Sequence, residues 1–478
     1  MINRPNIVVI LVDDLGWRDL GCYGSTFYET PRLDQLAREG LQFTDAYAAA
    51  PVCSPTRASI MSGKYPATVG VTQYIGGESV GALRDVPYLQ SLPLNEYSLA
   101  RALRSGGYRT WHIGKWHLGS NRTWPDKHGF DVNVAGCDWG RPPSYTSPYG
   151  CPTMHDGPSG EYLTDRLTDE AIQLIKASDD QPFFLNLWHY AVHTPIEAPA
   201  PLVHKYTAKA EALGLDEIEA VIDGEPLAPW HLNGEIMRRR VIQSDPHYAA
   251  MVENLDHNVG RLLDALQECG KADNTVVIFT SDNGGLATAE GSPTTNAPLS
   301  QGKGWMHDGG IRVPLLVRWP GHVAPARMTA EPVTSPDFYP TLLEVADLSP
   351  LPEQHVDGRS FRALLDDEPF QRGPIFWHYP HYSNQGGAPG AAVRDGASKL
   401  IRYFEDDHLE LYHLDRDIEE RIDLAAQEVD EVARLKQLLD SWMESVHAQV
   451  PKRNPYPSPW PALSRTNSSD HTAPRQSR

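Results

Sequence analysis

The sequence predicts an α/β protein with a large, mostly parallel central sheet flanked by helices, and a smaller C-terminal α+β subdomain that contains an antiparallel sheet. Continuous apolar runs such as NIVVILVDD (6–14) are typical of strands that are buried on both faces. Amphipathic helical patterns alternate with these runs, which implies right-handed crossovers between parallel strands. The chain has 478 residues, enough for one large core and an accessory unit.

Strands and helices alternate over the first two thirds of the chain. The predicted strands are 6–14, 108–114, 182–190, 274–285 and 311–321. The helices that precede the second, third and fourth of these strands are 95–107, 161–177 and 245–270. Helix 245–270 is the best defined, because an apolar stripe runs along one face and Gly270 ends it.

The pattern changes after about residue 370. Segments 374–382, 390–404 and 409–415 have the features of short antiparallel strands, and an amphipathic helix with Leu435 and Leu439 on its apolar stripe follows them. The expected organisation is an N-terminal catalytic domain over 1–370, an α+β subdomain over 371–450, and a Pro- and Ser-rich arm and tail over 451–478.

Composition restricts the classes of partner. The formal charge of −20 and the acidic isoelectric point disfavour binding to nucleic acid or anionic membranes, so an anionic ligand would need a local cationic pocket. No apolar run approaches the ~20 residues of a membrane helix. The first apolar run follows Met1 too closely to be a secretory signal, which predicts a cytoplasmic protein. A periplasmic or secreted location is expected instead if a signal has been removed.

The cysteines are too few and too scattered for a disulfide scaffold, and no C-x-x-C pair suggests a zinc site; they are Cys22, Cys53, Cys137, Cys151 and Cys269. Cys137 and Cys151 share one loop-like region and either pair in an oxidising compartment or stay reduced. Cys53 lies between two prolines in PVCSPTRAS (51–59), which we interpret as a rigid turn held by Arg57. Nothing near it in the sequence offers a disulfide partner.

Acidic and amide side chains follow two of the predicted strands. Asp13 and Asp14 end the first strand, and Asp282 and Asn283 end strand 274–285. Ligands of open parallel sheets bind beyond the carboxyl ends of the strands, and these oxygen donors suit a hard cation such as Ca²⁺ or Mg²⁺. Such residues also simply begin turns after strands. Two pairs at equivalent positions favour a metal site.

Basic side chains form a second set at strand ends. Lys115 and His117 follow strand 108–114, His193 follows strand 182–190, and Lys303 lies in a glycine-rich loop before strand 311–321. A single loop histidine is more often a surface or hydrogen-bonding residue. Together with Arg57, however, these residues would suit a tetrahedral oxyanion.

Six motifs occur in an order that identifies a family. They are VDDLGW, CSPTRAS with its C-x-P-x-R core, GKWHLG, HTP, SDNGG and GKGWMHDGGIRVP. In these motifs the chain resembles the type I, formylglycine-dependent sulfatases of the alkaline phosphatase superfamily. SPDFYPTLLEVADL, DGRSF and ELYHLDRD extend the resemblance almost to residue 450. The resemblance implies an alkaline phosphatase-like fold and a sulfuric ester hydrolase.

The resemblance also implies roles for the candidate residues. A formylglycine-generating enzyme would convert Cys53 to 3-oxoalanine (formylglycine), whose hydrate is the nucleophile. The implied ligands of Ca²⁺, with Mg²⁺ as the alternative ion, are Asp13, Asp14, Asp282, Asn283 and the modified Cys53. Arg57 would orient the nucleophile, and Lys115 and Lys303 would hold sulfate oxygens. His193, assisted by Lys303, would protonate the leaving alcohol, and His117 would take a proton when sulfate is expelled.

The expected substrate is a sulfated small molecule or saccharide, with aryl sulfates as artificial substrates. Tyr74, Trp139 and Arg141 suit a sugar ring and a second acidic group, although structural packing is an alternative for each, and His378 and His381 are candidates to close the pocket. One competing hypothesis is a phosphomonoester, phosphodiester or phosphonate hydrolase of the same superfamily, against which Pro55 argues. Another is a non-catalytic sulfate binder, which would normally have lost a metal or nucleophile position. The oligomeric state stays open.

Overall fold

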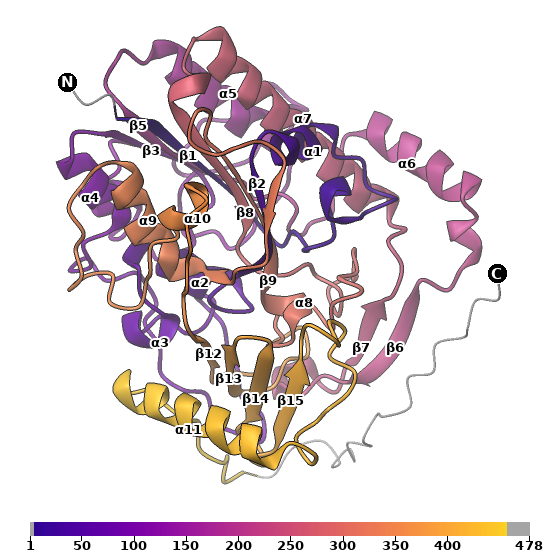
Figure 1. Cartoon of the computed structure of the whole chain (residues 1–478). Helices are drawn as coiled ribbons and strands as arrows, with labels where there is room; N and C mark the ends of the chain where they lie inside the picture. Colours follow the sequence, from indigo (N-terminus) through magenta and orange to yellow (C-terminus); the bar gives the residue numbers. More distant parts are fainter. Residues whose placement is uncertain (1–3, 457–478) are drawn as a thin grey trace.

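A computed structural model describes residues 4–456 of the chain. The predicted tail beyond residue 456 lies outside the described residues. Figure 1 shows a large central sheet with helices on both sides, and a smaller sheet at the bottom of the view that belongs to the C-terminal part of the chain.

The central sheet has nine strands in the order β10-β2-β9-β8-β1-β5-β3-β4, with β11 paired to β2. They are β1 (Asn6–Val12), β2 (Leu41–Tyr47), β3 (Arg109–Gly114), β4 (Val132–Val134), β5 (Phe183–Trp188), β8 (Thr275–Ser281), β9 (Arg312–Arg318), β10 (Arg327–Thr329) and β11 (Val333–Thr334). All pairings are parallel except those of β9, which is antiparallel to β2 and β8. The predicted large, mostly parallel sheet is confirmed.

The direction of β9 follows from its connection to β8. No crossover helix separates the two strands: a long loop leaves Ser281, and the short helix α8 (Asp308–Ile311) leads directly into β9. A strand that returns without a crossover pairs in the antiparallel direction. The loop before β9, which contains Lys303, therefore lies at the edge of the sheet where β8 and β1 end.

Helices cover both faces of the central sheet, as expected for a parallel sheet. One face carries α1 (Pro31–Arg38), α5 (Leu163–Ala177), α6 (Ala200–Ala212) and α7 (Pro246–Glu268). The other carries α2 (Cys53–Ser62), α3 (Pro66–Val69), α4 (Leu99–Ser105), α9 (Phe338–Val345) and α10 (Arg362–Leu365). Alternate residues of β1 divide between the faces: Val8 and Ile10 pack with the first set and Ile7 and Val9 with the second.

Segment 51–59 differs from its prediction as a turn. Helix α2 begins at Cys53 itself, Val52 is its extended N-cap residue, and the whole helix is buried. Pro55 is compatible with this helix because it stands in the first turn, where a backbone N–H has no intrahelical partner. Pro51 therefore precedes the helix, Cys53 is its first residue, and Pro55 stands in its first turn.

The C-terminal part forms a four-stranded antiparallel sheet, as predicted. Its strands, in spatial order, are β12 (Ile375–Tyr379), β13 (Gly390–Asp395), β14 (Ser398–Tyr403) and β15 (Leu409–His413). Helix α11 (Val429–Ser445) packs on one face through Leu435 and Leu439. The other face contacts residues of the central-sheet unit such as Tyr47 and Ile311, so one apolar cluster joins the two sheets. The predicted domain boundary near residue 370 stays a prediction.

The segment between β5 and α7 contains structure that the sequence did not predict. Besides α6, it forms the hairpin of β6 (Val221–Pro226) and β7 (Ile236–Arg240). The described chain also has short 3₁₀ helices: Gly21–Tyr23, Pro125–His128, Leu215–Glu217, Trp230–Leu232, Ala272–Asn274 and Ser335–Asp337.

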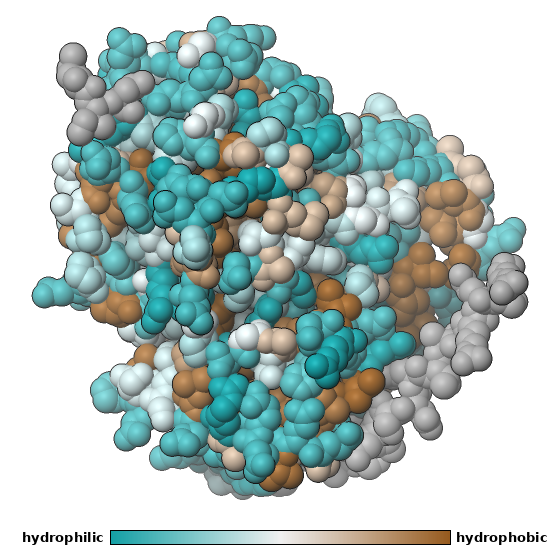
Figure 2. All heavy atoms as spheres, viewed as in Figure 1, coloured by the Kyte–Doolittle hydropathy of each residue, from teal (hydrophilic) through white to brown (hydrophobic). Residues whose placement is uncertain are grey.

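The surface agrees with the acidic, polar composition. Figure 2 shows this face covered mainly by hydrophilic residues, with hydrophobic atoms gathered at the right of the view near α6 and the hairpin. Exposed large hydrophobic residues there include Leu213, Ile218 and Ile236. None of the helices within residues 4–456 combines the length and the apolar character that crossing a bilayer requires.

Candidate active site

The carboxyl ends of neighbouring strands bring the predicted acids together. Asp13 and Asp14 follow β1, and Asp282 and Asn283 follow β8, whose last residue Ser281 pairs with Val12. The backbone N–H of Asp14 donates to Asp282 Oδ1 at 3.2 Å, and Asn283 Nδ2 donates to Asp14 Oδ1 at 2.8 Å. All four side chains are buried. The two pairs are thus parts of one cluster.

Each predicted lysine is paired with one of these carboxylates. Lys115, which follows β3, donates from Nζ to Asp13 Oδ2 at 2.6 Å. Lys303 donates from the loop before β9 to Asp14 Oδ2 at 2.8 Å. Both lysines are buried, so each ammonium group is held in place by a carboxylate as well as by packing.

Helix α2 adds the arginine and the cysteine. Arg57 Nε donates to Asp282 Oδ2 at 2.8 Å, and Nη1 donates to the carbonyl of Lys115 at 3.0 Å. The guanidinium also lies over the ring of Trp188, 5.1 Å from its centroid. These contacts orient the first turn of α2, so Cys53 is fixed relative to the acidic cluster.

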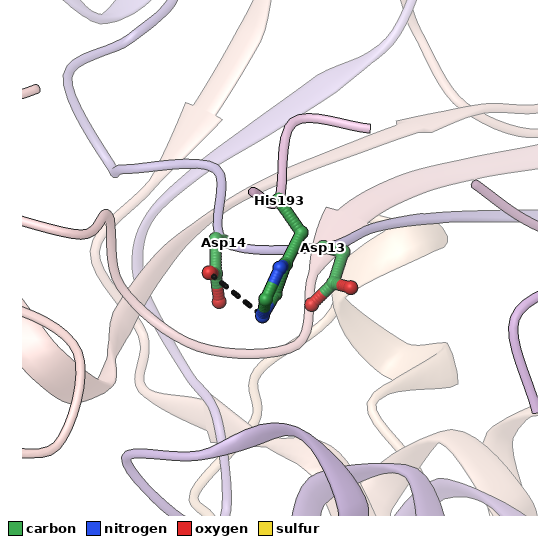
Figure 3. A group of neighbouring side chains, drawn as sticks. All are labelled: Asp13, Asp14 and His193. Atoms are coloured by element: carbon green, nitrogen blue, oxygen red, sulfur yellow. Dashed lines mark ion pairs between the residues drawn. The ribbon is translucent and has the colours of Figure 1, made fainter. Parts of the chain in front are cut away.

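The two predicted histidines contact different groups of the site. His117 Nδ1 is 3.3 Å from the Cys53 sulfur, and its Nε2 is 3.2 Å from the carbonyl oxygen of Ile75. His193 Nε2 is 3.6 Å from Asp14 Oδ2. Figure 3 shows the imidazole of His193 between the carboxylates of Asp13 and Asp14. One histidine therefore contacts the cysteine and the other the acids.

The donor set fits a hard divalent cation. Asp13 Oδ1 and Asn283 Oδ1 are buried and have no hydrogen-bond partner among the described residues. Arg57 Nη2 is 3.9 Å from Asp13 Oδ1, beyond hydrogen-bonding distance. Buried oxygens without partners are costly unless something else binds them, and carboxylate and amide oxygens are the ligands that Ca²⁺ prefers. Ligand atoms of Asp13, Asp14 and His193 lie within 4.8 Å of one another.

Burial and neighbouring charges shift the titration of the site. Burial raises the pKa of the Asp13 carboxyl well above its ordinary value, although Lys115 acts in the opposite direction. Burial also penalises the Asp14 carboxylate, but Lys303 and His193 outweigh it and hold the pKa of Asp14 below its ordinary value. Burial is the main cause that keeps the pKa of His117 and of His193 well below the ordinary value, and the nearby Lys115 (for His117) and Lys303 (for His193) act in the same direction.

The other residues singled out in the sequence lie in different places. Tyr74 is half-buried, and its hydroxyl accepts a hydrogen bond from Asn384 at 2.9 Å. Trp139 packs against Tyr190, and Arg141 is exposed.

His378 and His381, the candidates to close the pocket, are both buried and contact other groups of the chain, and their role stays a prediction. His378 contacts the carbonyl of Gln449, and His381 contacts Thr72 and Asp85. The residue after β12 that contacts Tyr74 is instead Asn384.

The cysteines are all free thiols. Cys137 and Cys151 are buried, and the interaction between their thiols raises the pKa of Cys137 and lowers that of Cys151 to about 7. The carbonyl oxygen of Cys137 accepts a hydrogen bond from the backbone N–H of His117 at 3.1 Å. Their loop therefore supports the histidine that contacts Cys53.

Sequence reasoning missed one further residue of this loop. A Cβ atom added at Gly140 would lie 2.8 Å from Cε1 of His117, so the backbone at Gly140 packs directly on that imidazole. The signal was present in the segment CDWG, because a glycine beside a functional loop often marks a close approach of backbone to another group.

Comparison with known proteins identifies relatives of the whole chain. The family model described as Sulfatase matches residues 5–348, and the model described as N-sulphoglucosamine sulphohydrolase, C-terminal, matches residues 301–449. A sulfatase of Formosa agariphila is 31% identical, with 95% of this chain and 92% of that protein aligned. Human N-acetylgalactosamine-6-sulfatase is 32% identical over 78% of this chain and 68% of that protein.

A solved structure extends the comparison to three dimensions. The crystal structure of Ps i-CgsB in complex with k-i-k-neocarrahexaose superposes with a TM-score of 0.73 at 28% sequence identity. The match covers 92% of each chain. The likeness therefore includes both the central sheet and the C-terminal sheet.

Proposed function

The chain belongs to the sulfatase family, whose members hydrolyse sulfate esters, and from this premise we propose that it removes sulfate from sulfated carbohydrates. Two relatives support the carbohydrate part of the proposal. One is N-acetylgalactosamine-6-sulfatase, and the other, Ps i-CgsB, was crystallised in complex with k-i-k-neocarrahexaose.

One observation carries the proposal at the level of chemistry. Cys53, in the C-x-P-x-R segment, is the first residue of α2, and its sulfur lies 3.3 Å from the buried His117. Arg57, on the same helix, binds Asp282 of the acidic cluster. Two buried lysines and a second histidine stand around the same cluster. A tetrahedral anion and a nucleophile would both find partners here.

We assign the nucleophile to Cys53 after conversion to formylglycine by a dedicated modifying enzyme. Once hydrated, this group would supply the hydroxyl that attacks sulfur, and it would release sulfate by returning to the aldehyde. The chain's own contribution is position: α2 fixes residue 53, and Arg57 orients it and offsets negative charge.

The metal is assigned to Asp13, Asp14, Asp282 and Asn283. Ca²⁺ bound by these oxygens would lower the pKa of the attacking hydroxyl and polarise the sulfate. The unpartnered Oδ1 atoms of Asp13 and Asn283 support this assignment. Mg²⁺ is the second candidate, because the same oxygen donors accept either ion.

The remaining residues receive proton and anion roles. Lys115 and Lys303 hold the sulfate oxygens, since their buried ammonium groups adjoin the cluster. His193, with Lys303 near it, donates a proton to the leaving alcohol, which matters because an alkoxide is a poor leaving group. His117 takes a proton from the residue at position 53, which it contacts.

The test is release of inorganic sulfate by protein produced together with a formylglycine-generating enzyme. The substrates are 4-nitrophenyl sulfate and a panel of defined sugar sulfates: N-acetylgalactosamine 6-sulfate, galactose 6-sulfate and galactose 4-sulfate. We expect turnover of the aryl sulfate and of at least one sugar sulfate, and none by Cys53→Ala. Peptide mass should show residue 53 as the aldehyde; an intact thiol in fully active protein would refute the nucleophile.

The second candidate is hydrolysis of phosphate or phosphonate esters, since a tetrahedral phosphoryl group would also fit lysines and a divalent cation. Pro55 in the C-x-P-x-R segment argues for sulfate. Matched 4-nitrophenyl phosphate and phenylphosphonate esters decide between the two. A higher kcat/KM for either than for 4-nitrophenyl sulfate would overturn the sulfatase assignment.

A further inference from the structure

A set of polar side chains from separate loops forms a hydrogen-bonded surface beside the site. Asn384 Nδ2 donates to the Tyr74 hydroxyl at 2.9 Å, and Asn384 Oδ1 is 3.1 Å from His231 Nε2. Gln385 Nε2 donates to Glu290 Oε1 at 2.5 Å. We call this set, Tyr74, His231, Glu290, Asn384 and Gln385, the polar wall.

One end of the polar wall adjoins the nucleophile. The residue after Tyr74 is Ile75, whose backbone N–H donates to Ser54 Oγ at 3.1 Å. Its carbonyl oxygen accepts from His117 at 3.2 Å. Tyr74 is therefore adjacent in the chain to Ile75, which contacts both Ser54 and the His117 that lies against Cys53.

The other end of the polar wall adjoins Lys303. Trp305 Nε1 donates to the carbonyl of Gln385 at 2.8 Å, and a Cβ atom at Gly387 would clash with the carbonyl oxygen of Gly304. The polar wall thus extends from the side of Cys53 to the side of Lys303.

The polar wall lies nearer the surface than the buried cluster does. His231 and Glu290 are exposed, Tyr74 and Asn384 are half-buried, and Gln385 is buried beneath them. The sulfate-binding groups lie deeper, since Lys115 and Lys303 are buried. A group attached to a bound sulfate would leave the buried cluster and meet the polar wall.

The chemistry of the polar wall suits an uncharged polar ligand. A phenol, an amide, an imidazole and a carboxylate can donate to or accept from sugar hydroxyls and acetamido groups. None of the five side chains is a lysine or an arginine. The carboxylate of Glu290 would repel a second anionic group placed next to it.

We propose that the polar wall binds the sugar ring that carries the scissile sulfate, through its uncharged hydroxyl or amide groups, and selects against a second sulfate or carboxylate beside Glu290. This inference rests on the proposed function and identifies the substrate class more closely: a saccharide end that is singly charged. The residues of the polar wall act on specificity and not on the reacting atoms.

Asn384→Ala tests the binding part. A small aryl sulfate fills the sulfate site without presenting sugar hydroxyls to the polar wall, so it serves as the internal reference. For the best substrate of the sugar sulfate panel we expect kcat/KM to fall about tenfold, the effect of removing hydrogen bonds to the substrate. For 4-nitrophenyl sulfate we expect a change of less than about twofold.

Glu290→Gln tests the selection against a second anion. We compare N-acetylgalactosamine 6-sulfate with its 4,6-disulfate, or the corresponding pair for whichever sugar is the best substrate. The ratio of kcat/KM for the disulfated to the monosulfated sugar should rise several-fold in Glu290→Gln. Glu225→Gln, an exposed glutamate of β6, is the matched control and should leave the ratio unchanged.

The outcomes separate this inference from the proposed function. Equal losses of sugar sulfate and aryl sulfate turnover in Asn384→Ala would overturn the polar wall, because a purely structural role predicts them. An unchanged ratio in Glu290→Gln would overturn the selection. Turnover of aryl sulfate with none of any sugar sulfate would refute the polar wall while the sulfatase chemistry stands. Absence of turnover of every sulfate ester would refute the proposed function itself.

Discussion

The charged residues of the candidate site are arranged as pairs. Arg57 pairs with Asp282, Lys115 with Asp13 and Lys303 with Asp14, and all of these side chains are buried. Buried charges are costly unless they are paired, so this balance makes the cluster tolerable in the interior. A divalent cation, a sulfate ester monoanion and an ionised hydroxyl would together add no net charge. The site would accept the three together more readily than any one alone.

Gly140 gives a prediction about a single residue. Gly140→Ala would place a Cβ atom 2.8 Å from Cε1 of His117, so the imidazole must move relative to Cys53. Because small displacements of a catalytic group are costly, we expect kcat to fall roughly tenfold to a hundredfold. Steady-state kinetics with 4-nitrophenyl sulfate measures this change.

The control for this substitution lies in the same loop. Asp138 is exposed, so Asp138→Ala should leave kcat within about twofold of the wild type. The melting temperatures of both variants should stay close to that of the wild type. Full activity of Gly140→Ala would mean that the position of His117 does not limit turnover.

Asn283 gives a prediction about the metal. After chelation with EDTA, sulfate release should stop, and Ca²⁺ should restore it and raise the melting temperature. Asn283→Ala removes one of the buried oxygens without a partner, so the Ca²⁺ concentration for half-maximal activity should rise by about tenfold or more. Asn121→Ala, an exposed asparagine, is the control. Activity that survives complete chelation would contradict the metal assignment.

Sequence reasoning located the acids, Lys115 and the two histidines because each follows a strand, whereas Lys303 precedes a strand and Arg57 lies on a helix. A residue placed soon after a buried parallel strand has a defined position, so the sequence alone leads one to expect Asp13, Asp282 and His193 at one edge of the sheet. Glu290 and Asn384 could not be found in this way. Their loops meet only because the C-terminal sheet packs on the loop that contains Lys303, and no local pattern encodes that contact.

Among the elements, the buried strands and the long helix α7 were predictable, whereas β2 and the hairpin of β6 and β7 were not. Strand β1 is a continuous apolar run, and α7 carries a clear apolar stripe. β2 reads LQFTDAY, in which Gln42 and Asp45 interrupt the apolar pattern although both are nearly buried. Its polar side chains are satisfied by distant groups such as Arg312 and the carbonyl of Cys22, which sequence alone does not place nearby.

The connection between β14 and β15 gives a prediction about pH. Glu410 and Asp406 raise the pKa of His408 to about 8 in the folded chain, above its ordinary value of 6.5. The folded state therefore binds this proton more tightly than the unfolded state does. The resulting stabilisation is fully present below pH 6.5 and is lost as the pH rises through about 8. Because His408 is partly exposed, solvent screening makes the effect small.

His408→Gln should remove this pH dependence. We expect the melting temperature of the variant to lie below that of the wild type at pH 6 and to converge with it by about pH 9, since the wild type loses its charge in between. Thermal unfolding of both proteins across this pH range gives the difference between their melting temperatures at each pH. Groups that titrate equally in both proteins do not contribute to this difference. A constant difference at every pH would contradict the assignment to His408.

At the scale of the whole molecule, the two sheets meet through buried charges as well as apolar contacts. Lys399 on β14 donates to Asp308 Oδ1 at 2.7 Å and to Glu420 Oε1 at 2.8 Å, and all three side chains are buried. Asp308 begins α8 and lies close in sequence to Lys303. The C-terminal sheet therefore supports the loop that carries a residue of the candidate site.

Lys399→Met tests this coupling. The substitution keeps most of the side-chain volume but removes the cation that Asp308 and Glu420 share, although Asp308 keeps its ion pair with Arg312. Loss of one partner from a buried ion pair costs about 3–5 kcal/mol. We expect a clear drop in melting temperature and, below that temperature, reduced kcat because the loop with Lys303 loses its support.

Lys436→Met is the matched control: this lysine pairs with Asp440 on the partly exposed surface of α11, where such pairs contribute only about 0.3–0.5 kcal/mol. If both variants unfold at the same temperature as the wild type, the buried network does not hold the sheets together. If Lys399→Met is less stable but fully active, the two sheets are joined there without any effect on the site.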